Sequence, residues 1–521
     1  MKGWSKKVYL ELPKPSEEDH RPLQVRLTAA LEDSGPFRLE EKTGYIRMRP
    51  AALRDAQRVC DKGDYRVTAT AGFDGHGWEL LGLEAGDTVK EHYGLCVDLG
   101  STTVLMELVD LNTGEILGKA GMFNPQINWG EDILSRIFYT KDQPEHRKRL
   151  QKATAEGFCA LMEQLREKTG IDTRSCPIMT VSGNTTMIHF HFLLGLDAFE
   201  VFQSPYAVQT LAPDICRAEE LGISMNGFVY CCPGLENYLG GDIISGMLAT
   251  GIPDQEEICV FLDVGTNGEL VVGNKDFLLA GAGAAGPALE GGVVHTGMRA
   301  EAGAVDRVTT EKGKLKVHVI GEGAARGICG SGIADLIAEL YLNGWIDLRG
   351  KFQEDVPEVV RVPGREDEES ELAVEYAPGL YFYQDDIDEF LKTKAAAMTM
   401  VEYMMNLIGL TMEDVGRFYV AGAFGTHFDK ESAVTIGLYP DIDREKIISP
   451  GNTSLQGAEK LLLDRSLADR AREIIERMEY VQFGAVEDFI HLMAAATAIP
   501  HTDLQRYPSV VRRLEERRKN K

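Results

Sequence analysis

The sequence is poor in basic residues and contains no long apolar run. Its 55 lysines and arginines stand against 81 aspartates and glutamates, which gives a formal net charge of −26. Such an acidic surface disfavours nucleic acid and anionic membranes as partners, because both are bound by basic patches. No stretch offers the roughly 20 consecutive apolar residues of a membrane span, and the N-terminus has no signal-peptide core. We therefore expect a cytoplasmic protein.

Clustered cysteines are also missing. The nine cysteines are scattered, and none forms the Cys-x-x-Cys pair that zinc ribbons and ferredoxin-type frameworks use. We expect no iron–sulfur cluster within the chain and interpret the adjacent Cys231 and Cys232 as structural, together with Cys329. His189 and His191 would face opposite ways on a strand and cannot easily share one metal ion, so we interpret them as structural too.

The length of the chain and the changes in its local composition indicate several domains. A chain of 521 residues exceeds what one hydrophobic core fills. Residues 1–20 are rich in Lys, Pro and Glu and read as a linker, and residues 21–92 suit a small α+β domain. Beyond residue 92, glycine-bounded apolar runs alternate with helix-length segments, which is typical of an α/β fold. We place similar subdomains at 93–250 and 251–500, and a basic, solvated helix end at 501–521.

One acidic turn is present twice. The stretches LCVDLGSTTVLMEL (95–108) and FLDVGTNGELVV (261–272) both place Asp-x-Gly between apolar runs, and a third apolar run follows each. Each half therefore predicts a three-strand meander that opens with an aspartate-bearing hairpin. A lone Asp-x-Gly is ordinary turn chemistry, but two copies in matching contexts indicate two similar lobes that face a common cleft.

The composition of the paired turns suits a polyphosphate. Gly100 and Gly265 allow close backbone approach, and the backbone N–H groups of such turns bind oxyanions. Asp98 and Asp263 repel phosphate and make sense as carboxylates that hold Mg²⁺ through its waters or orient an attacking water. The remaining predicted nucleotide contacts at the turns are Ser101, Thr102, Thr103, Thr266, Asn267 and Gly268. No Gly-x-x-x-x-Gly-Lys-Ser/Thr is present, so the site is not a Walker loop.

Further candidates lie towards the C-terminus. The stretch RFYVAGAFGTHFD predicts a strand that runs into Gly422, Ala423 and Gly425, small residues that let a flat base lie against the backbone. Glu290, within GPALEGG, is expected to help shape the nucleotide site. Gly332 belongs to a Gly-Ser-Gly that opens a predicted helix, where phosphate contact and plain packing are equally open interpretations.

Turns for phosphate, phosphate and adenosine, in this order, resemble the nucleotide motifs of the superfamily of acetate kinases, sugar kinases, DnaK-type chaperones and actin (ASKHA). The linking segments narrow the resemblance: NPQINWGEDILSRI, VSGNTTMIHFHFLLG, AGPALEGGVVHTGMRAEAGAV, RGICGSGIADLIAEL and GNTSLQGA. Together they closely resemble the reductive activators of corrinoid-dependent enzymes. The similarity extends from residue 93 to about 500, and residues 21–92 resemble the small middle domain of that family.

This resemblance implies an α/β fold in which a duplicated, actin- or hexokinase-like ASKHA ATPase places two lobes around a nucleotide cleft, preceded by the small α+β domain. It implies ATP and Mg²⁺ as cofactors, and ATP binding and hydrolysis as a conformational switch for reducing cobalt(II) to cobalt(I). The implied partner is a corrinoid protein of a methyltransferase system. Family members usually carry an iron–sulfur domain that these residues lack, so we expect an external ferredoxin-like electron donor or a missing domain. A homodimer is expected only by analogy.

Two other functions stay open. A small-molecule kinase of the same superfamily would phosphorylate a sugar or a carboxylate without any protein partner. A nucleotide-regulated scaffold would bind ATP without measurable turnover.

Overall fold

The computed structural model describes residues 2–35, 46–195, 199, 210–235, 237, 239–264, 267–284, 294–362, 370–483 and 487–519. The chain divides into two compact units. The first consists of Met1–Thr250 and Thr453–Arg477, and the second of Gly251–Asn452 and Met478–Lys521. Residues 453–477, which we had assigned to the second subdomain, therefore belong to the first unit. Within the described residues, no helix is long and apolar enough to cross a membrane.

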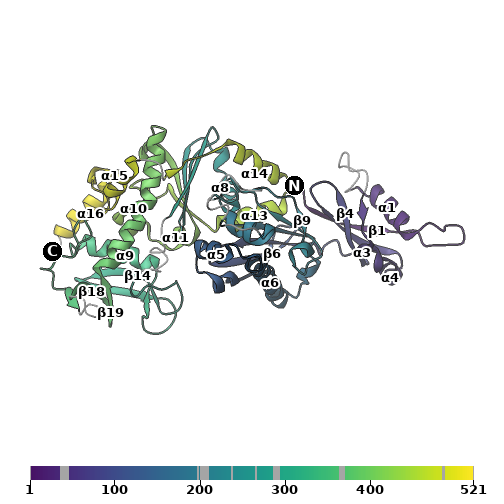
Figure 1. The fold of residues 1–521 in the computed structure, drawn as a ribbon, viewed down its shortest axis with the longest axis horizontal. Coiled ribbons are helices and arrows are strands. Elements are labelled where there is room, and N and C mark those ends of the chain that lie inside the picture. The colour runs from purple at the N-terminus through teal and green to yellow at the C-terminus, as the bar shows by residue number, and fades with distance from the viewer. Residues whose placement is uncertain are drawn as a thin grey trace. The chain divides into compact units, whose positions relative to one another are not determined.

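The N-terminal part of the first unit is a four-stranded sheet with short helices (Figure 1, purple end). Its strands, in spatial order, are β1 (Ser5–Glu11), β3 (Arg66–Phe73), β4 (Trp78–Ala85) and β2 (Arg47–Met48). Its helices are α1 (Leu23–Asp33), α3 (Pro50–Arg54) and α4 (Ala56–Lys62). The expected linker over residues 1–20 thus contains a strand, because the alternating side chains of Val8, Leu10 and Leu12 pack into the core under α1.

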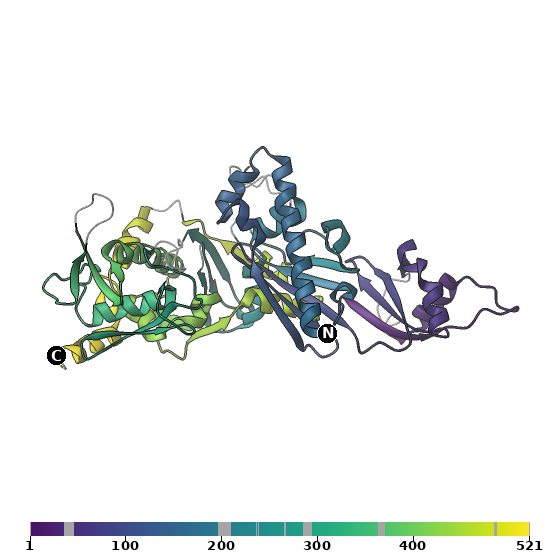
Figure 2. The ribbon, with the colours of Figure 1, turned by 90° about the horizontal axis from the view of Figure 1, so that it is seen from below.

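A six-stranded sheet forms the rest of the first unit. Its strands, in spatial order, are β7 (Ile116–Phe123), β6 (Thr103–Asp110), β5 (Tyr93–Leu99), β8 (Ile178–Ser182), β10 (Phe228–Cys231) and β9 (Cys216–Arg217). The helices are α5 (Ile133–Thr140), α6 (Pro144–Thr169), α8 (Gly241–Thr250), α13 (Thr453–Leu463) and α14 (Ser466–Arg477). Figure 2 shows the long blue helix α6 beside this sheet, where its apolar side chains share a core with β5, β6 and β8.

The sheet of the second unit repeats this plan. Its strands, in spatial order, are β21 (Ile447–Gly451), β20 (Val415–Ala421), β11 (Ile258–Val264), β12 (Asn267–Gly273), β13 (Leu278–Ala284) and β22 (Met478–Tyr480). In both sheets an antiparallel meander is followed by two strands parallel to its first strand. The predicted duplication of an ASKHA-type α/β fold is confirmed.

Further helices and two small sheets complete the second unit. The helices are α9 (Gly330–Leu342), α10 (Gln384–Leu407), α11 (Gly422–His427), α12 (Lys430–Ile436), α15 (Glu487–Ala496) and α16 (Pro508–Lys519). The strands are β14 (Ala304–Glu311), β15 (Lys314–Val319), β16 (Gly327–Ile328), β17 (Val359–Val362), β18 (Glu371–Ala377) and β19 (Leu380–Tyr383). Helices α9 and α10 cover the sheet with apolar residues and form a hydrophobic core with it.

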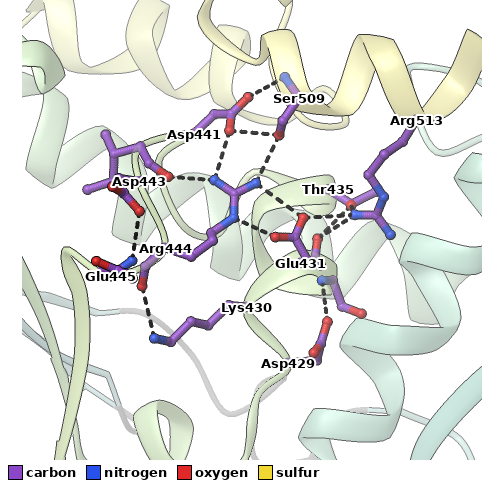
Figure 3. A network of polar contacts seen from close by, with 12 residues as sticks. Asp429, Lys430, Glu431, Thr435, Asp441, Asp443, Arg444, Glu445, Ser509 and Arg513 are labelled. Atoms are coloured by element: carbon purple, nitrogen blue, oxygen red, sulfur yellow. Dashed lines mark hydrogen bonds and ion pairs between the residues drawn. The ribbon is translucent and has the colours of Figure 1, made fainter.

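The C-terminal helix α16 is docked, whereas we had expected a solvated helix end. Val510 is fully buried, and Arg513 donates to the backbone oxygen of Glu431 and to Thr435 Oγ1 on α12 (Figure 3). Arg444 lies at the centre of the same network and donates to Glu431 and to Ser509 Oγ on α16. Arg513 and Arg517 of this segment thus make intramolecular contacts, whereas Arg512, Arg518 and Lys519 are exposed.

His189 and His191 do not lie on a strand, the case that we had considered for this pair. These residues lie in a π-helix, Thr186–Leu194, which starts just after β8. Both side chains are buried, and neither ring nitrogen finds a hydrogen-bond partner among the described residues. Burial lowers the pKa of His189 to about 4 and that of His191 to about 3, so both rings are neutral. The structural interpretation of the pair fits this environment.

Candidate nucleotide site

The first acidic turn lies where β5 ends. Asp98 is the penultimate residue of this strand and is paired with Leu105 on β6 and with Ser182 on β8. Side chains alternate along a strand, so Asp98 shares the face of Cys96, opposite to the face that Leu95 and Val97 pack against α6. Helix α13 packs on this second face. The carboxylate of Asp98 consequently meets the beginning of α13.

A row of hydroxyl groups holds the carboxylate of Asp98. Ser454 Oγ, in the first turn of α13, donates a 2.7 Å hydrogen bond to Asp98 Oδ1 and lies 3.0 Å from Ser182 Oγ. Ser182 Oγ in turn lies 2.8 Å from Ser245 Oγ on α8. All three serines are buried, so their hydroxyls have few alternative orientations. This arrangement fixes the direction of the Asp98 side chain before any ligand binds.

The residues that follow Asp98 form a tight, accessible turn. A Cβ atom added at Gly100 would lie 2.6 Å from the carbonyl oxygen of Thr103, so only glycine fits this position. Ser101 and Thr102 are half-buried, and Thr103, the first residue of β6, is exposed. Hydroxyl groups and backbone therefore reach the surface at the point where the sequence predicts a phosphate contact.

The second acidic turn occupies the matching place in the second unit. Asp263 is the penultimate residue of β11 and is paired with Glu269 on β12 and with Ala421 on β20. Gly268 is buried in the hairpin opposite Val264. Of the other predicted contacts, Gly265, Thr266 and Glu290 lie outside the described residues, as does the side chain of Asn267.

The predicted adenosine element adjoins this second turn. Strand β20 runs directly into α11, as expected, and Gly422 at the junction has a φ angle of +72°. A Cβ added at Gly422 would lie 3.0 Å from Asp263 Oδ1, so the two predicted elements are in contact. At Gly425 an added Cβ would lie 1.8 Å from the carbonyl oxygen of Val420, which excludes any side chain. The side chain of Ala423 lies outside the described residues.

Gly332 is explained by packing. It lies in the first turn of α9, as the Gly-Ser-Gly pattern predicts, and an added Cβ would lie 2.3 Å from the carbonyl oxygen of Val305 on β14. The neighbouring Ser331 donates to the carbonyl oxygen of Asp306. Close contact between α9 and β14 thus accounts for this glycine, and a phosphate contact stays a prediction.

Sequence reasoning missed the counterpart of Gly422 in the first unit. Gly183 follows β8 as Gly422 follows β20, and an added Cβ would lie 2.5 Å from the carbonyl oxygen of Leu99. The signal was present, because Val181-Ser-Gly repeats the Val420-Ala-Gly of the adenosine element. Ser454 was also missed, although it lies in the quoted segment GNTSLQGA.

The nine cysteines are free thiols. Seven of the nine are buried, and none forms a disulfide. Burial raises the pKa of Cys232 and of Cys259 to about 12, so these thiols stay protonated and are poor nucleophiles and poor metal ligands. The structural interpretation of the cysteines fits these environments.

Profiles of known families match nearly the whole chain. The RACo linker region matches residues 1–90, the RACo middle region matches residues 93–255, and the C-terminal ASKHA domain of RACo matches residues 257–511. Residues 21–92, which we likened to the middle domain, thus fall almost entirely in the linker region of the family. The chain belongs to the RACo family of reductive activators of corrinoid proteins. Membership in the RACo family makes residues 257–511 an ATP-binding ASKHA domain.

Individual proteins extend the match. The corrinoid activation enzyme RamQ of Eubacterium limosum is 32% identical over 425 residues, which are 78% of this chain and 70% of RamQ. A [Co(II) methylated amine-specific corrinoid protein] reductase of Methanosarcina barkeri is 26% identical, over 74% of this chain and 73% of the reductase. A solved reductive activator for a corrinoid, iron–sulfur protein superposes with a TM-score of 0.84 at 36% identity. That superposition covers 98% of this chain and 81% of the solved one.

Proposed function

We propose that this protein uses ATP to drive the reduction of cobalt(II) to cobalt(I) in a corrinoid protein of a methyltransferase system. The observation that carries the proposal is the duplicated acidic turn, with Asp98 and Asp263 at equivalent strand ends in a chain of the RACo family. In the reduction the cobalt gains one electron. The donor is an iron–sulfur protein of the ferredoxin class, or an iron–sulfur domain outside these residues.

The two turns suit different parts of the nucleotide. Backbone N–H groups and hydroxyls of Ser101 to Thr103 suit phosphate oxygens, and Gly422 leaves room for a flat base beside the second turn. The carboxylates of Asp98 and Asp263 are hard oxygen donors of the kind that Mg²⁺ prefers, and Ser454 already fixes one of them. Mg²⁺, when bound there, would neutralise phosphate charge.

The free energies involved are compatible with a conformational switch. Moving one electron to an acceptor whose reduction potential is 100 mV lower costs about 2.3 kcal/mol. Turning a two-state equilibrium from 1:99 to 99:1 requires about 5.5 kcal/mol of differential binding. An ATP-driven change of conformation can therefore offset a gap of roughly 200 mV at the cobalt by altering its ligation. No phosphoryl group has to be transferred to the corrinoid protein, and ATP is hydrolysed to ADP and phosphate.

The proposal is tested with the absorption spectrum of the corrinoid. The protein, a cobalt(II) corrinoid protein, a chemical reductant and ATP are mixed, and the cobalt(I) band is followed. We expect cobalt(I) to form only with ATP, and we expect the corrinoid protein to stimulate ATP hydrolysis. Formation of cobalt(I) at the same rate without ATP would contradict the proposal. Phosphorylation of a sugar or a carboxylate in the absence of a partner would favour the kinase alternative.

We also propose a homodimer, by analogy with related folds. Sedimentation of the purified protein measures its mass directly, and a monomer at micromolar concentration would remove this part of the proposal.

A further inference from the structure

The carbonyl groups of the first turn are all held from one side. Asn124 Nδ2 donates to the carbonyl oxygen of Gly100 at 2.7 Å, and the backbone N–H of Asn124 donates to that of Thr102 at 2.8 Å. Between them, Arg136 Nη2 donates to the carbonyl oxygen of Ser101 at 2.7 Å. Three successive carbonyls of the turn thus point towards two residues that follow β7.

This pattern sets the direction of the N–H groups. In a trans peptide the C=O and the N–H of the same peptide unit point in opposite directions. Because the carbonyls of residues 100–102 point towards Asn124 and Arg136, the N–H groups of Ser101, Thr102 and Thr103 point to the other side. A row of N–H groups aimed the same way is the arrangement that binds phosphate oxygens.

Arg136 also brings a buried positive charge to the turn. Its side chain is inaccessible to solvent, and its Nε donates to the carbonyl oxygen of Gly130 at 2.8 Å. Among the described residues, the one hydrogen-bond partner of Nη1 is the sulfur of Met187, at 3.3 Å, which is a weak acceptor. No ion pair joins the guanidinium to a described carboxylate, and the nearest acidic influence is Asp132, the N-cap residue of α5, whose charge partly opposes the effect of burial on the pKa of Arg136. Burial lowers the pKa of Arg136 to about 10, so the group is still a cation at neutral pH.

A buried cation without a direct ion-pair partner is unusual, since taking a charge out of water is costly unless it is paired. Carbonyl oxygens solvate the guanidinium of Arg136 only in part. A bound polyphosphate on the far side of the turn would supply the missing negative charge. The cost of burying Arg136 is then reduced when the nucleotide binds.

We propose that Arg136 is a positioning residue for the phosphates of the nucleotide, acting through the turn at residues 100–103 without touching the ligand. It fixes the N–H groups towards the phosphates, together with Asn124, and it adds a positive field at the turn. The identity of the ligand as ATP rests on the proposed function.

The two contributions of Arg136 are separated by measuring the affinities for ATP, ADP and AMP by calorimetry. With Arg136→Met we expect the affinity for ATP to fall about 10- to 100-fold. The loss should be smaller for ADP and smallest for AMP, because the field acts on phosphate charge. With Arg136→Lys the charge remains and the carbonyl bonds are weakened, so the loss should be intermediate and the order of the three ligands should persist.

Arg26 provides the matched control. It is a buried arginine of the same unit that donates to carbonyl oxygens, but it has a carboxylate partner in Asp19 and lies on helix α1 of the N-terminal part. We expect Arg26→Met to lower the melting temperature and to leave the three affinities unchanged. A structural role for Arg136 alone predicts the same pattern for Arg136→Met, or an equal loss for all three ligands.

The possible outcomes separate the role of Arg136 from the ATPase function of the protein. If the natural protein binds ATP and Arg136→Met and Arg136→Lys bind it equally well, the role of Arg136 is overturned and the ATPase function stands. If the natural protein binds no adenine nucleotide, both are overturned. A graded loss from ATP to AMP in Arg136→Lys supports the role even when Arg136→Met does not fold.

Discussion

The two acidic turns occupy the same place in equivalent sheets, yet they are built differently. In the first unit, position 182 on the neighbouring strand is a serine that joins a hydroxyl row, and Ser454 donates to Asp98. In the second unit, the corresponding position is Ala421, and the backbone of Gly422 lies against the carboxylate of Asp263. Ser454 holds the carboxylate of Asp98, and the backbone of Gly422 lies close to the carboxylate of Asp263.

The two carboxylates therefore suit different tasks. A carboxylate that is oriented in advance suits a task that depends on direction, such as holding a hydrated cation or a water molecule. A carboxylate beside a side-chain-free backbone leaves space for a ligand. We therefore expect substitutions at Asp98 and its hydroxyl row to act mainly on turnover, and substitutions at the backbone beside Asp263 to act mainly on nucleotide affinity.

The strongest test removes each carboxylate in turn. Asp98→Ala and Asp263→Ala should each slow ATP hydrolysis by about 100- to 1,000-fold, the range seen when a group that orients reacting charge is lost. Partner-stimulated phosphate release measures the effect, with an unchanged melting temperature as the control. Full activity of either variant would show that its turn does not belong to the ATPase site.

Acidification should affect the two units in opposite directions. Burial raises the pKa of Asp335, on α9, from its usual value of 3.8 to about 6. Between these two pH values the Asp335 side chain is protonated in the folded protein and ionised in the unfolded chain. The resulting stabilisation is present below pH 3.8 and is lost as the pH rises through 6. His189 and His191 have lowered pKa values, so the stability that their neutral form gives is lost as the pH falls below 6.5.

The Asp335 contribution is isolated by Asp335→Asn. This variant should be more stable than the natural protein by about 2 kcal/mol at pH 7.5, and the difference should vanish near pH 4. Hydrogen exchange of peptides from each unit reports the two stabilities separately. A pH-independent difference would mean that burial does not shift the titration of Asp335.

Filling the space beside Asp263 tests whether the nucleotide lies next to Gly422. Gly422→Ala introduces a Cβ at 3.0 Å from Asp263 Oδ1 and a strained positive φ, and should weaken nucleotide binding about tenfold. Gly409 is the matched control, because it also has a positive φ (+69°) but an added Cβ there meets open space. Gly409→Ala should lower stability by about 1 kcal/mol without a change in affinity. Equal affinities for both variants would contradict the proximity of the ligand to Gly422.

The smallest effect is expected at the hydroxyl row. Ser454→Ala leaves Asp98 in place but frees its direction, and should lower kcat about threefold to fivefold with little change in KM. Ser466→Ala is the control, because Ser466 Oγ also donates to an aspartate, Asp464, at 2.7 Å, on the surface of the same unit. A change in KM alone would assign Ser454 to nucleotide binding instead of orientation.

Much of the fold followed from the sequence because its signals are local. Both meanders, the strand that runs into α11 and the helix that begins at the Gly-Ser-Gly were predicted from apolar periodicity and turn residues. The C-terminal segment 501–521 was interpreted as a solvated helix end because the sequence shows its basic charge but not its partners. Its partners Glu431 and Thr435 on α12 are distant in the chain.

The site followed the same rule. The positions of Asp98, Gly100, Asp263 and Gly422 were predicted because composition marks a turn wherever it occurs. The role of Ser454 was not, since 356 residues separate it from Asp98.

The sequence by itself determined the two turns and the strands that carry them, because the alternation of side chains and the need for glycine act between neighbours in the chain. Only the tertiary structure decided which groups hold these turns. The face of β5 that Asp98 shares with Cys96 is covered by α13, and the carbonyls after Gly100 are held by Asn124 and Arg136. Hydrogen bonds depend on distance in space, and packing brings these partners together after the local structure is set.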